Sequence, residues 1–174
     1  MIDTILIPVD GSAASRKAMT FGSDLAARYD ARIVLLHVLL RQNLAEGLRG
    51  LSELERTSGG GLESLGKALG DLPLNKVLGS ARAGEAVPRE VLDFIARQVV
   101  DYAEKIARAK GVANIKSLIE DGDPAKRIIE CAEKENADTI VMGARGLSDI
   151  EGLLLGSVSH KIAHLASCTV ITVR

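Results

Sequence analysis

Four residues near the C-terminus have the types and spacing of a phosphate-binding loop. Gly143 and Gly146 are separated by two residues, and after nine more residues Gly156 is followed by Ser157. Glycine lets backbone N–H groups approach an anion without interference from a Cβ atom, and the first turn of a helix offers unpaired N–H donors at the positive end of its dipole. The pattern therefore indicates a cradle for a polyphosphate, with the Ser157 hydroxyl as a further donor.

Two cations lie close to this glycine pattern, Arg145 within it and Lys161 just after it, and either can add positive charge. Taken alone, the pattern also fits an ordinary strand-to-loop turn followed by a helix boundary at Gly156, because short glycine spacings are common. The elements that surround the pattern must decide between these interpretations.

Short runs of apolar, β-branched residues alternate with segments of helical periodicity along the chain. Runs at 4–9 and 33–38 enclose a helix at 13–29, with Ser12 or Ser15 as its N-cap, and together they make a βαβ unit. The later elements continue the alternation: a helix at 89–110 stopped by Gly111, a strand at 115–119, a helix at 124–135 capped by Asp123, a strand at 138–142, a helix at 157–166 and a strand at 169–173. The sequence thus predicts an α/β fold, a doubly wound, five-stranded parallel sheet with helices on both faces, which is Rossmann-like.

The composition fits a single domain of this kind. The chain has 174 residues, of which 47% are hydrophobic but only 2% aromatic, so the core must consist of Ile, Leu, Val and Ala. We expect one domain over residues 1–174 with a Gly-rich variable insertion at about 41–87, since that segment carries three consecutive glycines and no sustained periodicity.

Charge and cysteine usage exclude several classes of function. The 22 basic and 23 acidic residues leave a net charge of -1, so no field of a single sign draws the chain to nucleic acid or to an anionic membrane. The N-terminus lacks the pattern of a signal peptide and no apolar run approaches the roughly 20 residues of a membrane helix, so we expect a cytoplasmic protein. Cys131 and Cys168 have no partner at ligand spacing and are expected to be buried thiols.

In this order of elements, the pattern Gly-x2-Gly-x9-Gly-Ser resembles the ATP-binding signature of the universal stress protein family. The resemblance covers roughly residues 1–40 and 90–174, and it extends to Pro8-Val9-Asp10-Gly11-Ser12, His37-Val38, Gly122-Asp123-Pro124-Ala125 and Gly143-Ala144-Arg145-Gly146-Leu147-Ser148. It implies an ATP-binding regulatory protein of the stress response, with slow ATP hydrolysis at most.

The resemblance also implies roles for individual residues. Asp10 would face the ribose or adenine, Val38 would line the adenine pocket and Met142 would cover it, while the glycines and Ser157 would hold the phosphates. Mg²⁺ would be bound through the phosphates of ATP rather than by a protein metal motif. The implied nucleotide-binding residues are Pro8, Val9, Asp10, Val38, Met142, Gly143, Arg145, Gly146, Gly156, Ser157 and Val158.

Proteins of this family often dimerise through their last strand, so the resemblance implies a homodimer through residues 169–173. The chain has Cys168-Thr169-Val170 where the family usually has Cys-Pro-Val. The N–H group of Thr169 can donate a hydrogen bond that proline cannot, so we expect the pairing at this edge to differ. The sequence names no protein partner.

Three other patterns do not support a competing chemistry. Residues 61–68 nearly spell a P-loop, but Ala68 replaces the Mg²⁺-binding Ser or Thr and no strand precedes them. His160 and His164 lack the acidic and third ligands of a zinc helix, and the set Asp10, Ser12 and His37 lacks the Gly-x-Ser-x-Gly elbow of a hydrolase.

Two alternatives to a regulatory ATP-binding protein stay open. One is a nucleotide-dependent ATPase or synthetase on the related scaffold, although the sequence has neither a Ser-Gly-Gly-x-Asp-Ser loop nor a His-x-Gly-His motif. The other is an interaction dimer without nucleotide, which would be expected to have a broken glycine pattern. No general base can be placed beside the phosphate loop from the sequence, so efficient turnover is not expected.

Overall fold

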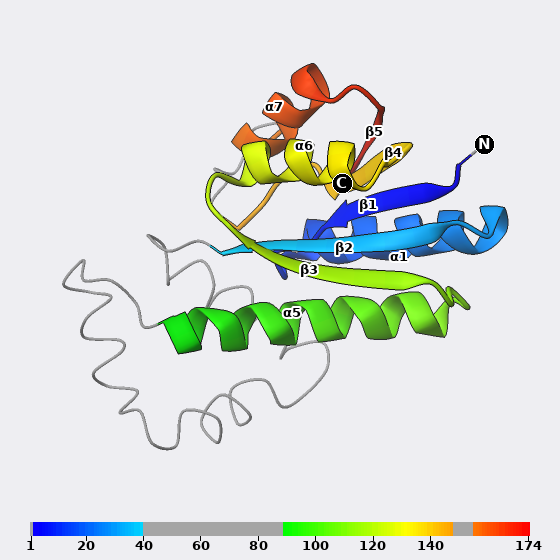
Figure 1. Cartoon of the computed structure of the whole chain (residues 1–174), viewed down its shortest axis with the longest axis horizontal. Coiled ribbons are helices and arrows are strands. Elements are labelled where there is room, and N and C mark those ends of the chain that lie inside the picture. The colour runs from blue at the N-terminus through cyan, green and yellow to red at the C-terminus, as the bar shows by residue number, and fades with distance from the viewer. Residues whose placement is uncertain (1, 40–88, 148–154) are drawn as a thin grey trace.

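The predicted sheet and helices are present in the computed structural model, which describes residues 2–39, 89–147 and 155–174 (Figure 1). The strands, all parallel, are β1 (Thr4–Pro8), β2 (Arg32–Leu39), β3 (Ile115–Asp121), β4 (Thr139–Gly143) and β5 (Thr169–Val173). The helices are α1 (Ala13–Tyr29), α5 (Arg89–Ala109), α6 (Pro124–Lys134) and α7 (Ser157–Leu165). The predicted fold class is confirmed; the predicted insertion at 41–87 and the P-loop-like residues 61–68 lie outside the described residues.

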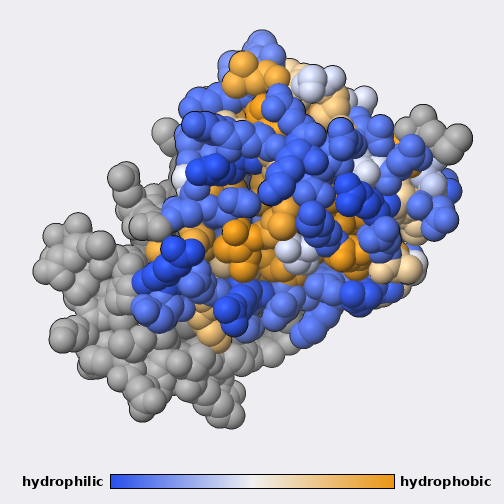
Figure 2. Space-filling view, viewed as in Figure 1, coloured by the Kyte–Doolittle hydropathy of each residue, from blue (hydrophilic) through white to orange (hydrophobic). Residues whose placement is uncertain are grey.

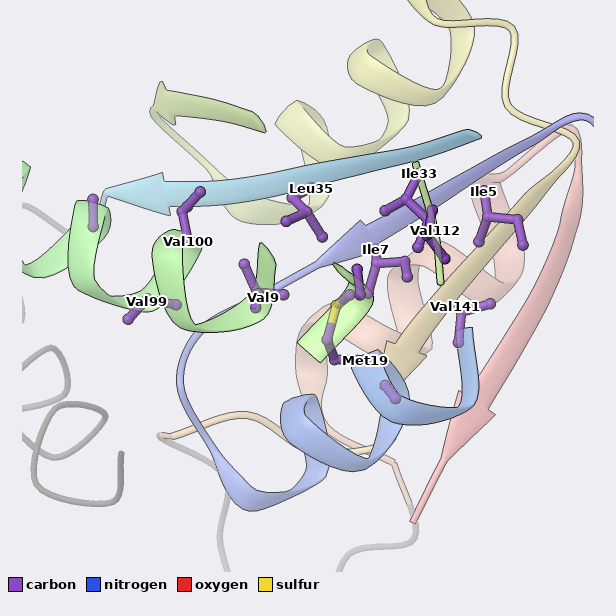
Figure 3. Packing of buried hydrophobic residues seen from close by; sticks show 14 of the residues in the cluster. Ile5, Ile7, Val9, Met19, Ile33, Leu35, Val99, Val100, Val112 and Val141 are labelled. Carbon is purple, nitrogen blue, oxygen red and sulfur yellow. The ribbon is translucent and has the colours of Figure 1, made fainter. Parts of the chain in front are cut away.

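Helices cover both faces of the sheet, α1 and α5 on one face and α6 and α7 on the other (Figure 1). Alternate strand residues supply the two cores because successive side chains of a strand point to opposite faces. Figure 3 shows the first core, in which Ile5, Ile7 and Leu35 of the sheet pack against Met19 of α1 and Val99 of α5. The second core contains Leu6, Val34, Leu36, Val38, Ile140 and Met142 together with residues of α6 and α7. The burial of each of these aliphatic side chains stabilises the folded state by about 1.5–3 kcal/mol relative to leaving it exposed.

The helix ends follow from short-range signals in the sequence. Ser12 caps α1, its hydroxyl oxygen accepting the N–H of Ser15 at 3.1 Å, and Asp123 caps α6 by accepting the N–H of Lys126 at 2.9 Å. Gly111 follows α5 with φ 88°, a left-handed conformation that glycine adopts without strain. The predicted caps and stop are therefore confirmed, with Ser12 rather than Ser15 as the first cap.

The strand order β3-β2-β1-β4-β5 places the point where the chain changes direction between β1 and β4. The chain runs from β1 outward to β2 and β3 and then returns to β4 on the other side of β1. The loops that follow β1 and β4 therefore diverge and leave a crevice at the carboxyl ends of these strands. Ligands of open α/β sheets bind at such a switch point.

The two outer strands, β3 and β5, each have one edge without a neighbour among the described residues. Figure 2 shows hydrophobic side chains gathered at the centre of the face where Figure 1 has β3 between α5 and α6. Ile119 of β3 is 38% exposed, and in β5 no residue is fully buried. The edges thus explain why β3 and β5 are more exposed than the three central strands.

Thr169 uses its backbone N–H within the sheet. The N–H of Thr169 donates to the carbonyl oxygen of Asp138 at 3.2 Å, and the carbonyl oxygen of Val173 accepts the N–H of Ala144 at 2.8 Å. Thr169 and Val173 are therefore bonded toward β4, and since alternate residues of a parallel strand bond one neighbour, Val170 and Thr172 turn their backbone groups to the free edge. The additional N–H of Thr169 therefore lies inside the sheet, on the side of β4.

Two acidic residues tie the amino-terminal ends of the strands together. The Asp138 carboxylate accepts the N–H groups of Asp3 at 2.8 Å and Thr4 at 2.9 Å, and these bonds lower the pKa of Asp138. The buried Glu135 carboxylate lies 2.8 Å from the ammonium group of Lys116 and 3.4 Å from the guanidinium group of Arg32. The hydrogen bond from Lys116 is the main reason that the pKa of Glu135 is lowered.

Both cysteines are free thiols, as expected. Cys131 is buried in the second core, and burial raises its pKa to about 11, so it is not a reactive thiolate at neutral pH. Cys168 is only half-buried, so the expectation of a buried thiol is wrong for this residue.

Candidate functional site

A cavity of about 150 Å³ opens at the carboxyl ends of β1, β2 and β4. The first turns of α6 and α7 and one residue of α1 complete its wall. The lining residues are Pro8, Val9, Asp10, Ser15, Leu36, Val38, Pro124, Ile128, Met142, Gly143, Arg145, Gly146, Leu147, Ser157, Val158 and Ser159. The cavity therefore occupies the switch point that the strand order defines.

Every residue that the sequence implicated in nucleotide binding lines this cavity except Gly156. Lys161, considered as a source of positive charge, is exposed and does not line it, whereas Arg145 does. Six further residues line the cavity without having been predicted from the sequence: Ser15, Leu36, Pro124, Ile128, Leu147 and Ser159. Leu36 could have been found from the period of a strand, because it lies two residues before Val38 and on the same face.

Most of the wall is apolar. Leu36 and Val38 come from β2, Met142 from β4, and Pro124 and Ile128 from the first turns of α6, where their spacing of four residues puts them on one side of the helix. Such a surface suits a flat, uncharged group, and the few polar groups at its rim fix the orientation of a ligand.

Asp10 supplies the one carboxyl group among the described lining residues. Its Oδ1 atom accepts the N–H of Ser12 at 2.9 Å, and its carboxylate also accepts the backbone N–H of Leu147. Burial nevertheless raises the pKa of Asp10, and the hydrogen bonds offset this only in part. Asp10 thus connects the loop after β1 to the loop after β4.

His37 lies on the other side of the sheet and does not line the cavity. Its Nδ1 atom is 2.8 Å from the carbonyl oxygen of Val9, to which it donates, and burial lowers its pKa. The Ser12 hydroxyl is used to cap α1. A catalytic triad of Asp10, Ser12 and His37 is therefore absent.

The first turn of α7 borders the cavity and has no side-chain cap. Gly156 is its N-cap residue, and Ser157, Val158 and Ser159 of this turn line the cavity. The carbonyl oxygen of Ala144 fixes the turn, since it accepts both the N–H of Gly156 and the hydroxyl of Ser159 at 2.7 Å. The positive end of the α7 dipole thus faces the cavity.

Gly143 has a packing role that the sequence did not reveal. A Cβ atom at Gly143 would lie 2.9 Å from the carbonyl carbon of Ala14 and 3.0 Å from the backbone nitrogen of Ser15. The end of β4 therefore approaches the backbone of α1 more closely than any residue with a side chain allows. This glycine is required by the fold whether or not a phosphate contacts it.

The described residues contain neither a metal-binding group of three or more side chains nor a helix that could cross a membrane. They contain no group of three or more His, Cys, Asp or Glu side chains that could hold a metal ion. Among the helices in these ranges, none combines the length and the hydrophobicity that crossing a bilayer requires.

The sheet and its cavity define an α/β protein with a cavity at the switch point of a doubly wound sheet. The model of the universal stress protein family matches residues 1–174, and the chain belongs to this family. It is 29% identical to universal stress protein YxiE of Bacillus subtilis, over 100% of both chains. It is 30% identical to universal stress protein MJ0531 of Methanocaldococcus jannaschii, over 98% of this chain and 81% of that protein.

Solved structures of the family share the fold. A universal stress protein in complex with cAMP superposes with a TM-score of 0.62 at 21% identity, covering 99% of this chain and 97% of its own. The universal stress protein of Archaeoglobus fulgidus in complex with dAMP has a TM-score of 0.60 at 15% identity, with coverage of 100% and 98%. A family protein from Arabidopsis thaliana with AMP bound has a TM-score of 0.58 at 16% identity, with coverage of 98% and 90%.

Proposed function

We propose that the cavity binds an adenine nucleotide, ATP with Mg²⁺, and that its occupancy regulates the protein in the stress response. One observation carries this proposal: an apolar slot and the uncapped first turn of α7 meet in one cavity at the switch point of the sheet. An apolar slot suits a purine base, and a helix N-terminus suits a phosphate group.

The base would lie between the side chains of Val38, Met142 and Ile128. The carboxylate of Asp10, at the rim of the cavity, would accept hydrogen bonds from the ribose hydroxyls. A purine in the slot would be removed from water on both faces. This burial would contribute about 25 cal/mol to the free energy of binding for each Å² of apolar surface. The complexes of relatives with cAMP, dAMP and AMP support an adenine nucleotide rather than another base.

The phosphates would extend toward α7. Gly146 and Ser157 would bring their backbones to the phosphates, and Arg145 would add the one cationic side chain that lines the described part of the cavity. Gly156 would begin this turn as its N-cap, with its own N–H bonded to the carbonyl oxygen of Ala144. Mg²⁺ would be held by the phosphates, since the described residues offer no carboxylate cluster for it.

Binding rather than efficient hydrolysis is the proposed activity. Asp10 is the one carboxyl group on the described wall, and it already accepts N–H groups from Ser12 and Leu147. A general base must lie within hydrogen-bond distance of an attacking water, and the engaged Asp10 is poorly placed for this role. We further propose a cytoplasmic homodimer through residues 169–173, with an unidentified protein as the recipient of the signal.

The direct test is to denature the purified protein and to identify any released nucleotide by anion-exchange chromatography. Isothermal titration calorimetry with AMP, ADP, ATP and cAMP, each with and without Mg²⁺, then gives the preference, and GTP serves as the control for the base. If no nucleotide is released and none binds, the proposal is wrong and the interaction dimer without nucleotide is favoured.

One arginine variant and one lysine variant form a matched pair that tests whether Arg145 contacts the phosphates. Arg145→Ala removes the cation that lines the cavity, whereas Lys161→Ala removes an exposed cation of α7 that does not. We expect Arg145→Ala to weaken ATP binding by about 1 kcal/mol, roughly fivefold, while adenosine binding and the Lys161→Ala variant stay unchanged. If both variants lose the same ATP affinity, the effect comes from the total positive charge near α7 and not from a contact between Arg145 and the phosphates.

A further inference from the structure

The outward face of α7 carries two neighbouring imidazoles, His160 and His164. Their ring centroids are 4.7 Å apart, and their planes are inclined by 69°. Both residues are exposed, while Ser159 and Ile162 of the same helix are buried on the opposite side. The pair is therefore open to solvent and lies outside the cavity proposed for the nucleotide.

We propose that His160 and His164 form a bidentate binding site for a divalent transition metal ion of the Ni²⁺ or Cu²⁺ type. Residues four apart on a helix are neighbours one turn from each other, so two imidazoles at this spacing can bind one ion. Neutral imidazole nitrogens are good ligands for such ions. The site needs no rearrangement of the helix, because both side chains already lie on one face.

The separation of the rings is short enough for chelation after the side chains rotate. The two rings meet edge to face, with centroids 4.7 Å apart. A metal–nitrogen bond of about 2.0–2.1 Å places the metal about 3.2 Å from the centroid of each ring, so rotation about the side-chain torsions at this separation brings one nitrogen of each ring to a shared ion.

The order of affinities decides which ion is favoured. The affinity of a nitrogen site for divalent ions rises through Ni²⁺ to Cu²⁺ and falls again at Zn²⁺. The residues of α7 include no Asp or Glu, so water molecules would fill the remaining positions of the ion.

The other histidine of the chain does not compete for the ion. His37 is buried and donates to the carbonyl oxygen of Val9. The half-buried Cys168 is the described side chain that can compete, since a thiolate binds the same ions. A test must therefore distinguish the two imidazoles from this thiol.

The experiment uses the full chain and titrates it with NiCl₂ and, separately, CuCl₂ by isothermal titration calorimetry. His160→Ala and His164→Ala each remove one ligand. The double variant His164→Ala with Leu165→His keeps two histidines but separates them by five residues, which turns the rings to different sides of the helix. Leu165 is 64% exposed, so this replacement does not disturb the core.

We expect the wild-type chain to bind one Ni²⁺ ion, and each alanine variant to bind it more than about tenfold more weakly. Removing a residue that only hydrogen-bonds a metal ligand already lowers metal affinity by about tenfold or more, so the removal of a ligand itself should cost at least as much. The five-residue variant should be as weak as the alanine variants, and Cys168→Ser should bind like the wild type. If the three histidine variants keep the wild-type affinity, or if Cys168→Ser loses it, the site is not at His160 and His164. Since the test uses no nucleotide, its outcome is independent of the nucleotide proposal.

Discussion

Gly143 at the end of β4 lies against the backbone of Ala14 so closely that a Cβ atom there would be 2.9 Å from the carbonyl carbon of Ala14. The contact is between a strand end and the first turn of a helix, and neither backbone can move without disturbing the sheet or the cap of α1. A glycine that resembles part of a phosphate loop is thus needed for the packing of the fold itself.

The first prediction follows from this contact. We expect Gly143→Ala to lower the free energy of unfolding by about 1–3 kcal/mol, as overpacking does. The matched control is Gly22→Ala, whose Cβ would meet side-chain atoms and no backbone: Cδ1 of Ile7 at 2.6 Å, Cγ1 of Ile7 at 3.4 Å and Cβ of Val141 at 3.5 Å. The end of the Ile7 side chain can turn away more easily than a backbone can, and the alanine gains about 1 kcal/mol of helix propensity. Urea unfolding of both variants measures the difference, and an equal loss of stability in the two would contradict the prediction.

The second prediction concerns the cost of charging Asp10. Burial raises the pKa of Asp10 above its ordinary value of 3.8. Stability linked to such a group is fully present below the unfolded pKa and is lost as the pH rises through the folded pKa. Asp10→Asn abolishes this loss, so we expect the variant to be more stable than the wild type at pH 7 and to approach it below about pH 4.

Chemical denaturation at a series of pH values measures this convergence. The same variant should bind ATP more weakly, because the carboxylate proposed to face the ribose is gone, and a gain in stability with a loss of binding is common for functional residues. A stability difference that stays constant from pH 3 to pH 8 would contradict the assignment of the effect to the Asp10 charge.

Much of the fold was predictable because its local signals agree with one another. The apolar runs at 4–9 and 33–38, the cap at Ser12 and the Asp123-Pro124 pair each specify one element. Within each predicted strand and helix, the aliphatic residues recur with the period of that element. The predicted bounds consequently differ from the observed ones by no more than two residues, for example 115–119 against Ile115–Asp121 for β3.

The candidate site was less predictable because it depends on contacts between segments that are distant in sequence. Pro124 and Ile128 join the cavity only because α6 packs beside β2, whereas from the sequence both belong to the helix expected at 124–135 and neither is assigned to the site. The hydrogen bond between Asp10 and Leu147 likewise depends on β1 lying next to β4. The order of strands in a sheet depends on the whole fold, so it cannot be derived from the spacing of residues in the sequence.

The third prediction concerns the opposite end of the sheet. The N–H groups of Asp3 and Thr4 hold the pKa of Asp138 below 3.8. A carboxylate with a lowered pKa stabilises the fold above the unfolded pKa, and this contribution disappears as the pH falls through the lower, folded value. We expect Asp138→Asn to be less stable than the wild type at pH 7 and to lose less stability on acidification below about pH 4.

Guanidinium unfolding between pH 2 and pH 7 measures the acid branch of the stability curve. Asp10→Asn is an informative comparison, since removing that charge should raise stability at pH 7 whereas removing the Asp138 charge should lower it. If both variants change stability in the same direction at neutral pH, one of the two pKa directions is wrong.

The last prediction distinguishes the two sides of β5. The N–H of Thr169 donates inward to Asp138, whereas the backbone of Thr172 faces the free edge. Thr172→Pro therefore removes an N–H that a partner strand would use, while Thr169→Pro removes one that lies within the chain.

Size-exclusion chromatography with light scattering measures the effect on the proposed homodimer. We expect the wild type and Thr169→Pro to be dimers and Thr172→Pro to be a monomer that keeps the wild-type far-UV circular dichroism spectrum. Thr169→Pro should lose about 1 kcal/mol of stability, the value of one ordinary hydrogen bond. A monomeric wild type, or a dimer that survives Thr172→Pro but not Thr169→Pro, would show that copies of the chain do not pair through the edge of β5, because only the outward N–H is available to a second strand.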